Sequence, residues 1–587
     1  MDYKSLVLTY TLLEKTSKRL EKTHIIAELL KRTPKDELAQ VCLLLEGSVF
    51  PPHAEEKLGV SEKLIIKALS VAFGHPAQLI ENWFRELGDL GDVAAKLVGE
   101  KKQRTLMASH LTVKKVFNNL RKLPELQGSG SVDQKVQLIA ELLADASPLE
   151  AKYATRTVLQ QLRVGVATGT LRDAIVWAFL NPPGEYEEKE NDFKISDEDR
   201  KTYNDLVDAT QKAYDLLTDF GKVAELAKEK GLKGLGKLEL SIGIPLKLML
   251  CQKAESVEDA FERVGKPAVF EFKYDGFRIQ VHKKGDEISL FTRRLENVTK
   301  QFPDVVKAVK EHVKGTDFIL DGEAVGFDAK TKKYLPFQMI SQRIKRKHGI
   351  EEMAKQFPVE LCVFDVLLYK GESQLHIPQQ ERRKIVEKLI DPKPYMITPS
   401  KSLVTDSVTK AKEFFAKSLS AGEEGLIAKS PTSEYQPGSR VGFQVKIKGA
   451  LDTLDLVIVG AEWGEGKRSG WLTSFTLACL DEDGSFKECG KVGTGIKEKE
   501  EAGGITFEEL TNRLKPLIKE EKGREVKIKP KIVIEIECEE VQASPTYESG
   551  YALRFPRVIQ VREDKPASEA TTLSMLKDQF KKQKGAR

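Results

Sequence analysis

The hydrophobic pattern of the chain changes near residue 240, and this change requires at least two kinds of domain. Before it, apolar residues recur three and four positions apart, as Tyr3, Leu6, Tyr10 and Leu13 do, which predicts amphipathic helices. After it, apolar and polar residues alternate strictly over 277–282, which predicts a half-buried strand. A chain of 587 residues is also too long for a single hydrophobic core.

The pattern divides the chain into three domains. We predict an all-α domain over residues 1–235, an α+β domain over 236–448, and a small β-barrel with a C-terminal helix over 449–587. Within the first domain, the acidic stretch 185–200 is interpreted as a surface loop. Ser131 is the expected N-cap of one helix, and another helix is expected over 171–180.

Composition excludes several classes of protein. The 94 basic and 89 acidic residues give a net charge of only +5, so a nucleic-acid binder must gather its positive charge on one face. The six cysteines form no C-x-x-C pair, which argues against a disulfide scaffold or zinc ribbon and fits a reducing cytoplasm. No signal peptide and no run of eighteen apolar residues is visible, so no membrane partner is expected.

A basic surface interrupted by glycines is expected on the helical domain. Glycine-rich stretches cover residues 123–131 and 163–170, and each would either bind a phosphate or merely connect two helices. Cationic side chains accompany them at Lys114, Lys115, Arg121 and Lys122. Such a surface offers DNA contacts to its backbone and shape rather than base reading.

Lys273 ends a predicted strand and is followed by Asp275, Gly276 and Arg278. A lysine held by rigid strands suits covalent catalysis, and neighbouring cations would disfavour its ammonium form and so expose a nucleophilic amine. The pattern Lys-x-Asp-Gly alone is a weak signal, because a surface lysine beside a β-turn can have the same sequence.

More charged residues follow or end the later predicted strands. Glu323 is the last residue of Asp321-Gly322-Glu323, which follows an apolar run. Glu424 is the first residue of a stretch that ends at Lys429. Lys446 and Lys448 lie on one face of a strand over 440–448. Cations and carboxylates are therefore expected to gather at strand ends in the middle domain.

Together these motifs closely resemble those of ATP-dependent DNA ligases of the archaeal and eukaryotic replicative type. The resemblance covers nearly the whole chain and implies an OB-fold for the last domain. The motifs occur in one order: Lys273-x-Asp275-Gly276, Thr292-Arg293-Arg294, Leu320-Asp321-Gly322-Glu323, Val363-Phe364-Asp365, Glu424-Gly425-Leu426-Ile427-Ala428-Lys429, Lys446-Ile447-Lys448 and Arg554-Phe555-Pro556-Arg557.

The resemblance implies a role for each matching residue. Lys273 would attack the α-phosphorus of ATP to give a lysyl-AMP intermediate, Glu271 would contact adenine, and Phe364 would stack on it. Glu323 would hold the ribose or a metal, and Glu424 a divalent metal, for which Mg²⁺ suits the all-oxygen donors. The remaining residues would bind phosphates: Arg278, Arg293, Arg440, Lys446 and Lys448, with Arg554 and Arg557 orienting the pyrophosphate.

The same resemblance implies the partners. Nicked double-stranded DNA is the expected substrate, in replication, repair and recombination, and the protein is expected to be a cytoplasmic, nucleoid-associated monomer. A stretch containing Gln103, Leu106 and Met107 stands where archaeal ligases carry a sliding-clamp motif. Because it lacks the usual aromatic pair, a plain loop is the favoured interpretation and a clamp contact the alternative.

Three other functions stay open at this point. An RNA ligase or a GTP-using capping enzyme shares the lysine motif but does not need some 230 residues ahead of it. An NAD-dependent ligase would carry a four-cysteine zinc module, which is missing. A non-catalytic nucleic-acid scaffold would not need the lysine, arginines and carboxylates intact.

Overall fold

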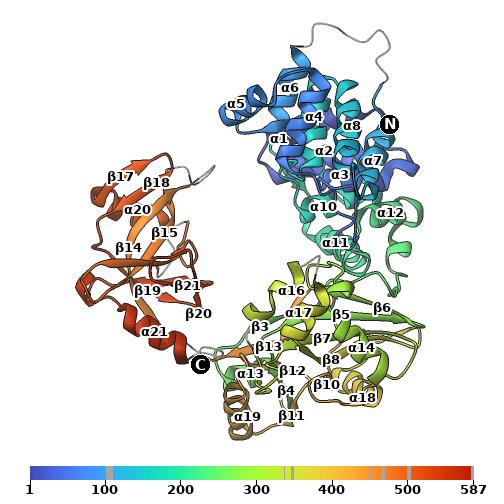
Figure 1. The fold of residues 1–587 in the computed structure, drawn as a ribbon. Helices are drawn as coiled ribbons and strands as arrows, with labels where there is room; N and C mark the ends of the chain where they lie inside the picture. Colours follow the sequence, from blue (N-terminus) through green and yellow to red (C-terminus); the bar gives the residue numbers. More distant parts are fainter. Residues whose placement is uncertain are drawn as a thin grey trace.

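The computed structural model describes residues 1–100, 110–335, 337–345, 349–449, 453–464, 468, 470–498 and 504–582. Figure 1 shows three parts in chain order, a helical part, a two-sheet part and a second β part, arranged around an open centre. Within the described ranges, no helix is both long and apolar enough to cross a membrane.

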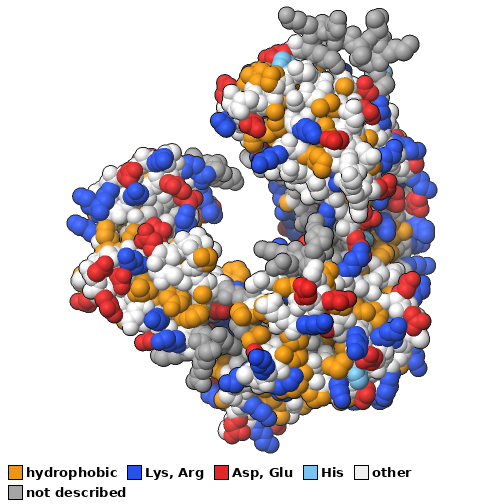
Figure 2. All heavy atoms as spheres, viewed as in Figure 1, with side chains coloured by type: hydrophobic (Ala, Val, Ile, Leu, Met, Phe, Trp, Pro, Cys, Tyr) orange, Lys and Arg blue, Asp and Glu red, His pale blue; other side chains and the backbone are white. Residues whose placement is uncertain are grey.

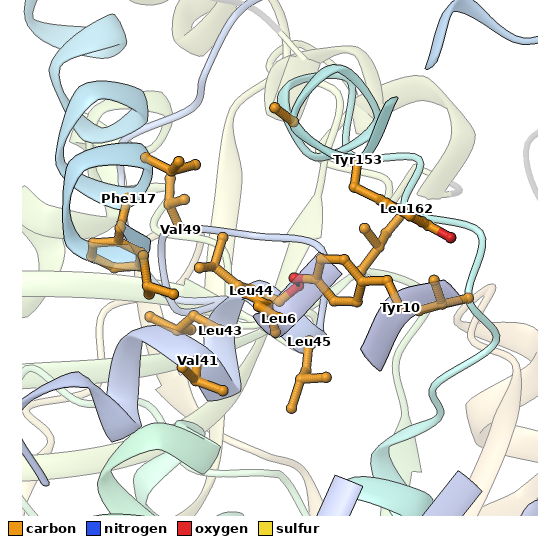
Figure 3. Close-up of a cluster of buried hydrophobic side chains, with 14 of the residues drawn as sticks. Leu6, Tyr10, Val41, Leu43, Leu44, Leu45, Val49, Phe117, Tyr153 and Leu162 are labelled. Atoms are coloured by element: carbon orange, nitrogen blue, oxygen red, sulfur yellow. Dashed lines mark hydrogen bonds between the residues drawn. The ribbon is translucent and has the colours of Figure 1, made fainter. Parts of the chain in front are cut away.

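The first part is mainly helical. Its helices are α1 (Tyr3–Lys15), α2 (Arg19–Arg32), α3 (Leu38–Leu45), α4 (Glu62–Phe73), α5 (Ala77–Leu87), α6 (Leu90–Gly99), α7 (Val113–Lys122), α8 (Ser131–Ala144), α9 (Pro148–Val158), α10 (Thr168–Phe179), α11 (Asp197–Leu217) and α12 (Phe220–Leu235). Figure 3 shows part of their common core, where Tyr10 packs against Tyr153 with ring centroids 5.1 Å apart. The Tyr10 hydroxyl donates to the carbonyl of Leu44 at 2.9 Å, which satisfies a polar atom inside this core.

The prediction of a purely helical domain was wrong at one place. Strands β1 (Glu185–Glu187) and β2 (Asp192–Lys194) form an antiparallel hairpin in the stretch expected to be a loop. The hairpin is held by its two aromatic residues, since Phe193 stacks on Trp177 at 4.6 Å and Tyr186 on His24 at 4.8 Å. Alternation over only three residues is too short to stand out in the sequence.

Helix starts also differ from the predictions. Ser131 is the first residue of α8, and Gly130 takes the N-cap position with φ +81°. Helix α10 begins at Thr168, three residues before the expected start. Glycine reaches the left-handed region without strain, so the chain enters α8 one residue earlier than a serine cap would require.

The middle part contains two sheets. Its elements are β3 (Leu250–Lys253), α13 (Val257–Val264), β4 (Ala268–Lys273), β5 (Phe277–Lys284), β6 (Glu287–Thr292), α14 (Pro303–His312), β7 (Asp317–Gly326), α15 (Phe337–Ile340), α16 (Gln342–Lys345), α17 (Ile350–Gln356), β8 (Val359–Tyr369), β9 (Glu372–Ser373), α18 (Gln379–Leu389), β10 (Ile397–Pro399), β11 (Ser402–Thr405), α19 (Val408–Ser420), β12 (Gly425–Lys429) and β13 (Arg440–Lys448). One sheet has the order β10-β8-β7-β5-β6, with β9 on β8, and the other has the order β11-β4-β12-β13-β3.

The short turn between β4 and β5 carries the chain from one sheet to the other. Lys273 ends a strand of the second sheet, and Arg278 lies in a strand of the first. A Cβ on Gly276 would lie 2.4 Å from the carbonyl oxygen of Ala324 on β7. Glycine is therefore required for the crossing, because β7 passes too close for any side chain.

The third part is built on a curved sheet. Its elements are β14 (Leu454–Trp463), β15 (Leu472–Leu480), β16 (Phe486–Val492), α20 (Phe507–Leu514), β17 (Ile518–Lys522), β18 (Glu525–Ile528), β19 (Val533–Glu537), β20 (Glu540–Ala543), β21 (Tyr551–Arg554), β22 (Arg557–Val561) and α21 (Leu573–Lys582). Strand β14 pairs with β19 through its first half and with β18 through its second half. One long strand thus serves two sheet segments, as happens where a sheet curls.

A buried ion pair fixes helix α18 on strand β8. The Arg382 guanidinium donates to both carboxylate oxygens of Asp365, at 2.7 and 3.0 Å, and the two side chains are 1% and 4% exposed. We expect Arg382→Met to lower the free energy of opening of this domain by about 3–5 kcal/mol, because Asp365 is left buried and unpaired. Hydrogen–deuterium exchange of the β8 amides measures this free energy.

Lys384→Met on the same helix is the matched control. Lys384 is 61% exposed and pairs with Glu381 at 2.7 Å, so its loss should change the opening free energy by at most about 0.5 kcal/mol. Equal exchange rates in the two variants would contradict the prediction.

Candidate active site

The candidate site begins on one face of the sheet β4-β12-β13. Residues that share a row across these strands are Glu271, Ile427 and Lys446 in one row, and Lys273, Gly425 and Lys448 in the next. Phe270 and Phe272, which alternate with the polar residues of β4, are buried in the core on the opposite face. The period of two thus separates an apolar face from a face carrying charged side chains.

The second row brings two ammonium groups onto one carboxylate. The Lys273 Nζ lies 2.6 Å from Glu424 Oε2, and the Lys448 Nζ lies 2.9 Å from the same oxygen. Gly425 separates the two lysines and has φ +142°, and a Cβ there would lie 2.1 Å from the carbonyl oxygen of Ile447. Only glycine therefore fits at position 425, between the two lysines that approach Glu424.

Electrostatics in this cluster follow from the shared contacts. Burial by itself would raise the pKa of Glu424, but the charges of Lys273 and Lys448 lower it to about 2. Burial lowers the pKa of Lys446, and the charge of Lys448 adds to this effect. The pKa of Lys448 is raised, because Glu424 and Glu539 outweigh its burial. Glu424 is thus held as a carboxylate between cations.

The contact between Lys273 and Glu424 differs from the sequence-based expectation. That expectation placed cations beside the lysine, whereas the structure places a carboxylate 2.6 Å away. The pairing of β12 with β4 is the cause, since the backbone N–H of Glu424 donates to the Lys273 carbonyl at 2.9 Å. The amine of Lys273 must leave this ion pair before it can act as a nucleophile.

Arg278 lies on the other sheet and is already bonded on several sides. It donates to Asp321 at 3.1 and 2.7 Å and to the carbonyl of Met249 at 2.7 Å. The Tyr435 hydroxyl also donates to Asp321, at 2.9 Å, and the Asp321 side chain is fully buried. This network holds the guanidinium in one orientation, with 18% of its side chain exposed.

Glu323 on β7 is paired across the strands with Arg278. Burial raises its pKa to about 8, although the charges of Lys273 and Arg278 act in the opposite direction. The carboxyl group of Glu323 is therefore largely protonated near neutral pH, and a protonated carboxyl both donates and accepts hydrogen bonds. Glu323 also lies beside the turn that joins the two sheets, since a Cβ on Gly276 would lie 3.0 Å from its Cγ.

Phe364 and Glu271 lie close to a third lysine. The half-buried ring of Phe364 has Lys429 Nζ 5.1 Å and Arg278 Cζ 5.5 Å from its centroid. Glu271 is 2% exposed, and its Oε2 accepts from Lys429 at 2.8 Å. Its Oε1 is buried and has no hydrogen-bond partner within the part of the chain that the structure describes. An unpaired buried acceptor of this kind is suited to a ligand that donates.

Sequence reasoning missed three residues of this site. Asp321 and Lys429 belong to motifs that were recognised, but no role was given to them. Arg383 on α18 lies outside every motif, and its Nη1 is 3.7 Å from Glu271 Oε1. Only the packing of α18 brings it there, so no local pattern could have indicated it.

The structure leaves four of the expected phosphate-binding residues away from this cluster. Arg293 is exposed in the turn after β6, and Arg440 is exposed at the start of β13, where it donates to the Cys251 carbonyl at 3.3 Å. Arg554 and Arg557 belong to the third part. Arg554 pairs with Glu540 at 3.0 Å, and Arg557 is exposed.

The third part nevertheless touches the middle part at the edge of the site. Lys448 pairs with Glu539 at 2.9 Å, and Lys253 pairs with Glu537 at 3.3 Å. The Arg554 guanidinium carbon also lies 5.4 Å from the ring centroid of Phe337 on α15. Lys448 is thus shared between Glu424 of its own domain and Glu539 of the next.

The basic surface of the helical part is only partly free. Lys114 and Lys122 are exposed on α7, whereas Lys115 pairs with Asp145 at 2.9 Å and Arg163 with Asp89 at 2.8 Å. Figure 2 shows an open hollow between the three parts, with Lys and Arg side chains at several places along its rim. The clamp residues Gln103, Leu106 and Met107 lie outside the described residues.

A divalent metal would find oxygen donors at Glu424 and Glu323. No group of three or more His, Cys, Asp or Glu side chains able to hold a metal occurs in the described ranges. Mg²⁺ commonly binds through one or two carboxylates together with substrate phosphates and water. The donor set present therefore fits Mg²⁺ bound with a nucleotide rather than a closed protein cage.

Comparison with known proteins gives three consecutive family matches. They are "DNA ligase N terminus" over residues 2–176, "ATP dependent DNA ligase domain" over 248–448, and "ATP dependent DNA ligase C terminal region" over 468–565. The chain is 47% identical over its whole length to a DNA ligase of Nanoarchaeum equitans, covering 99% of that protein. It is 43% identical to a DNA ligase of Thermococcus fumicolans, covering 99% of this chain and 98% of that protein.

Solved structures give a coarser likeness. The structure "Pmar-Lig_PreS3" is 18% identical, covers 95% of this chain and 99% of its own, and superposes with a TM-score of 0.53. At this identity it supports the three-part fold and nothing more.

The three family matches and the full-length relatives show that the chain is a DNA ligase. More particularly, it belongs to the family of ATP-dependent DNA ligases.

Protonation of Glu323 should make stability depend on pH. Its folded-state pKa of about 8 lies above an unfolded value near 4.3, so the folded state holds the extra proton and loses stability as pH rises between these values. We expect Glu323→Gln to remove this loss. The unfolding free energy of the variant minus that of the wild type should therefore rise by about 2–4 kcal/mol between pH 5 and pH 8. Paired thermal unfolding scans at several pH values measure the difference.

Glu413→Gln, an exposed residue on α19, is the control and should show a flat difference with pH. A flat difference for Glu323→Gln as well would contradict the prediction.

Proposed function

We propose that the protein seals nicks in duplex DNA through a covalent lysyl-AMP intermediate at Lys273. The amine attacks the α-phosphorus of ATP and expels pyrophosphate, the AMP then passes to the 5′-phosphate of the nick, and the 3′-hydroxyl finally attacks that phosphate and displaces AMP. The single observation that carries this proposal is the convergence of Lys273 and Lys448 on Glu424 across Gly425. It gives a nucleophile and a second cation in one row of the sheet, and a carboxylate on the residue just before the glycine of that row.

Charge neutralisation is the main demand of phosphoryl transfer. Lys446 and Lys448 lie on the same strand face as the nucleophile's row, which supports their contact with the phosphates of ATP. Arg278 is oriented by Asp321 and Tyr435, which supports a fixed phosphate contact. Arg293 and Arg440 are exposed at the ends of their strands, and we propose that they contact DNA phosphates.

Mg²⁺ is proposed as the metal, held by Glu424. When bound, the ion would neutralise charge on the phosphate oxygens. Glu424 is kept ionised by its two lysines, so it is ready as an oxygen ligand. Glu323 is better suited to the ribose than to the metal, because a protonated carboxyl group can donate to a hydroxyl.

Base binding is proposed at Phe364 and Glu271. The half-buried ring of Phe364 offers a stacking surface beside two cations, and Glu271 Oε1 offers a buried acceptor to which no described residue donates. ATP is the substrate that this pair of groups favours over GTP, since adenine carries an amine where guanine carries a carbonyl. This distinction, and the helical part ahead of residue 236, favour a DNA ligase over a capping-type enzyme.

The third part is proposed to be an OB-fold barrel that rotates between steps. Its curled sheet supports the OB-fold assignment. Arg554 and Arg557 lie in that part, so they reach the pyrophosphate only when the third part closes on the middle part.

We further propose the partners of the protein. The helical part, residues 1–235, binds the duplex backbone, and residues 103–107 contact a sliding clamp. The protein acts as a monomer in the cytoplasm.

Lys273→Ala should form no AMP adduct while still binding nicked DNA, because the nucleophilic amine is lost and no residue outside this side chain is changed. Intact-mass measurement after incubation with ATP and Mg²⁺ detects the adduct, and peptide mapping places it. Lys284→Ala, an exposed lysine at the end of β5, is the control and should be adenylated normally. An adduct on the Lys273→Ala protein would refute the assignment.

Arg557→Ala should slow enzyme adenylation by about 10²-fold or more, the size seen when one charge-stabilising group is lost. Sealing of a nick that already carries 5′-AMP should stay within about threefold of the wild type, since no pyrophosphate leaves in that step. Single-turnover rates on ATP and on pre-adenylated nicks separate the two steps. Equal losses in both steps would contradict a role in pyrophosphate release.

A further inference from the structure

Arg383 stands beside Glu271 Oε1, a buried oxygen of the base-binding region that accepts no hydrogen bond from the described residues. Its Nη1 is 3.7 Å from Glu271 Oε1, which is beyond hydrogen-bond distance. Its side chain is 12% exposed, and that of Glu271 is 3% exposed. The two charged groups therefore form a long ion pair without a hydrogen bond, and the other contacts of Arg383 explain the separation.

Ser400 is what restrains the guanidinium. Arg383 Nη1 donates to Ser400 Oγ at 2.7 Å, and Nη2 donates to the Ser400 carbonyl at 2.7 Å. The remaining Nε donates to Glu387 at 2.7 Å. Ser400 is itself 1% exposed and fixed, because its backbone N–H donates to the Val363 carbonyl at 2.7 Å. The arginine is thus tied to the residue preceding Phe364 in β8.

The other oxygen of Glu271 is fixed as well. Lys429 Nζ lies 2.8 Å from Oε2, so the carboxylate cannot rotate freely. A carboxylate in an ion pair only accepts hydrogen bonds. Oε1 is therefore held as a buried acceptor 3.7 Å from a positive charge, with no hydrogen-bond donor among the described residues, so a neutral N–H donor of a ligand would satisfy it.

We propose that Arg383 is a positioning residue that sets the preference for adenine. With Ser400 it fixes Glu271 Oε1 to accept from the 6-amino group of the base, and a 6-carbonyl base is rejected because two acceptors would meet. This inference rests on the proposed function, in which Glu271 contacts adenine. It adds a residue outside the recognised motifs and assigns it to base selectivity.

A pair of nucleotides tests the proposal on the full-length chain. ATP carries the 6-amino group, and purine riboside 5′-triphosphate lacks it but is otherwise the same. The measured quantity is the second-order rate of nucleotide transfer to Lys273, by single turnover of protein freed of AMP. The wild type should prefer ATP by about 10- to 100-fold, the range for a hydrogen bond to a charged group.

Arg383→Met should lower the rate with ATP by about 10-fold or more and leave the rate with purine riboside triphosphate within about twofold. Arg383→Lys, which keeps the charge but loses the planar fork, should retain part of the preference. Equal losses with both nucleotides would show that Arg383 only supports the fold, and an unchanged preference would show that it has no role. Either result overturns the proposal.

Arg343→Met is the matched control. Arg343 is a buried arginine of the same domain, 1% exposed and bonded to Asp304 at 2.6 and 2.9 Å, so its loss should affect both nucleotides by the same factor. If Arg383→Met does not fold, Ser400→Ala takes its place, since it removes the Oγ that holds Nη1. It should weaken the ATP preference, and an unchanged preference overturns the proposal.

The wild-type measurement separates this inference from the proposed function. A nucleotide adduct on Lys273 that forms equally fast from ATP and from purine riboside triphosphate overturns the inference and leaves the function intact. The absence of any adduct on Lys273 overturns both.

Discussion

The active-site region depends on one carboxylate placed between two ammonium groups. Glu424 lies 2.6 Å from Lys273 and 2.9 Å from Lys448, and this arrangement follows from the register of three strands around Gly425. A shift of one residue would turn Lys273 toward the apolar core and Phe272 toward the nucleotide. Strand pairing thus fixes the chemistry as firmly as the side chains themselves do.

Two sheets supply different parts of the site, and buried ion networks keep both walls in place. One sheet carries Lys273, the proposed nucleophile, with Glu271 and the two lysines of β13, while the other sheet carries Arg278, Glu323 and Phe364. Asp321 is bonded by Arg278 and Tyr435. Removing charge from water is costly, so such groups are retained where each is paired and bonded. Here their orientation serves the chemistry of a DNA ligase.

The contacts between the second and third parts are few and mostly ionic. Lys448 and Lys253 meet Glu539 and Glu537, and Arg554 approaches the ring of Phe337. Ion pairs near the surface contribute little stability, so they are compatible with the proposed rotation of the third part between steps. The shared lysine, Lys448, links the position of that domain to the charge around Glu424.

The sequence by itself determined a helical part, two β-rich parts and the family, because periodicity and ordered motifs are local properties. It also predicted Lys273, Glu323 and Glu424 as charged residues at strand ends of the middle part. This was wrong for Glu323, which lies inside β7 because that strand continues to Gly326. The sequence did not give the hairpin at 185–194, which aromatic packing decides, or the start of α8, which a positive-φ glycine decides.

Only the tertiary structure decided which charges meet. It placed Glu424 rather than a cation against Lys273, joined Glu271 to Lys429, and brought Arg383 within 3.7 Å of Glu271 from a helix that carries no motif. These groups are separated by about a hundred residues or more in the chain. Their meeting depends on the pairing of strands and the docking of a helix, and distances of this kind leave no trace in a local pattern.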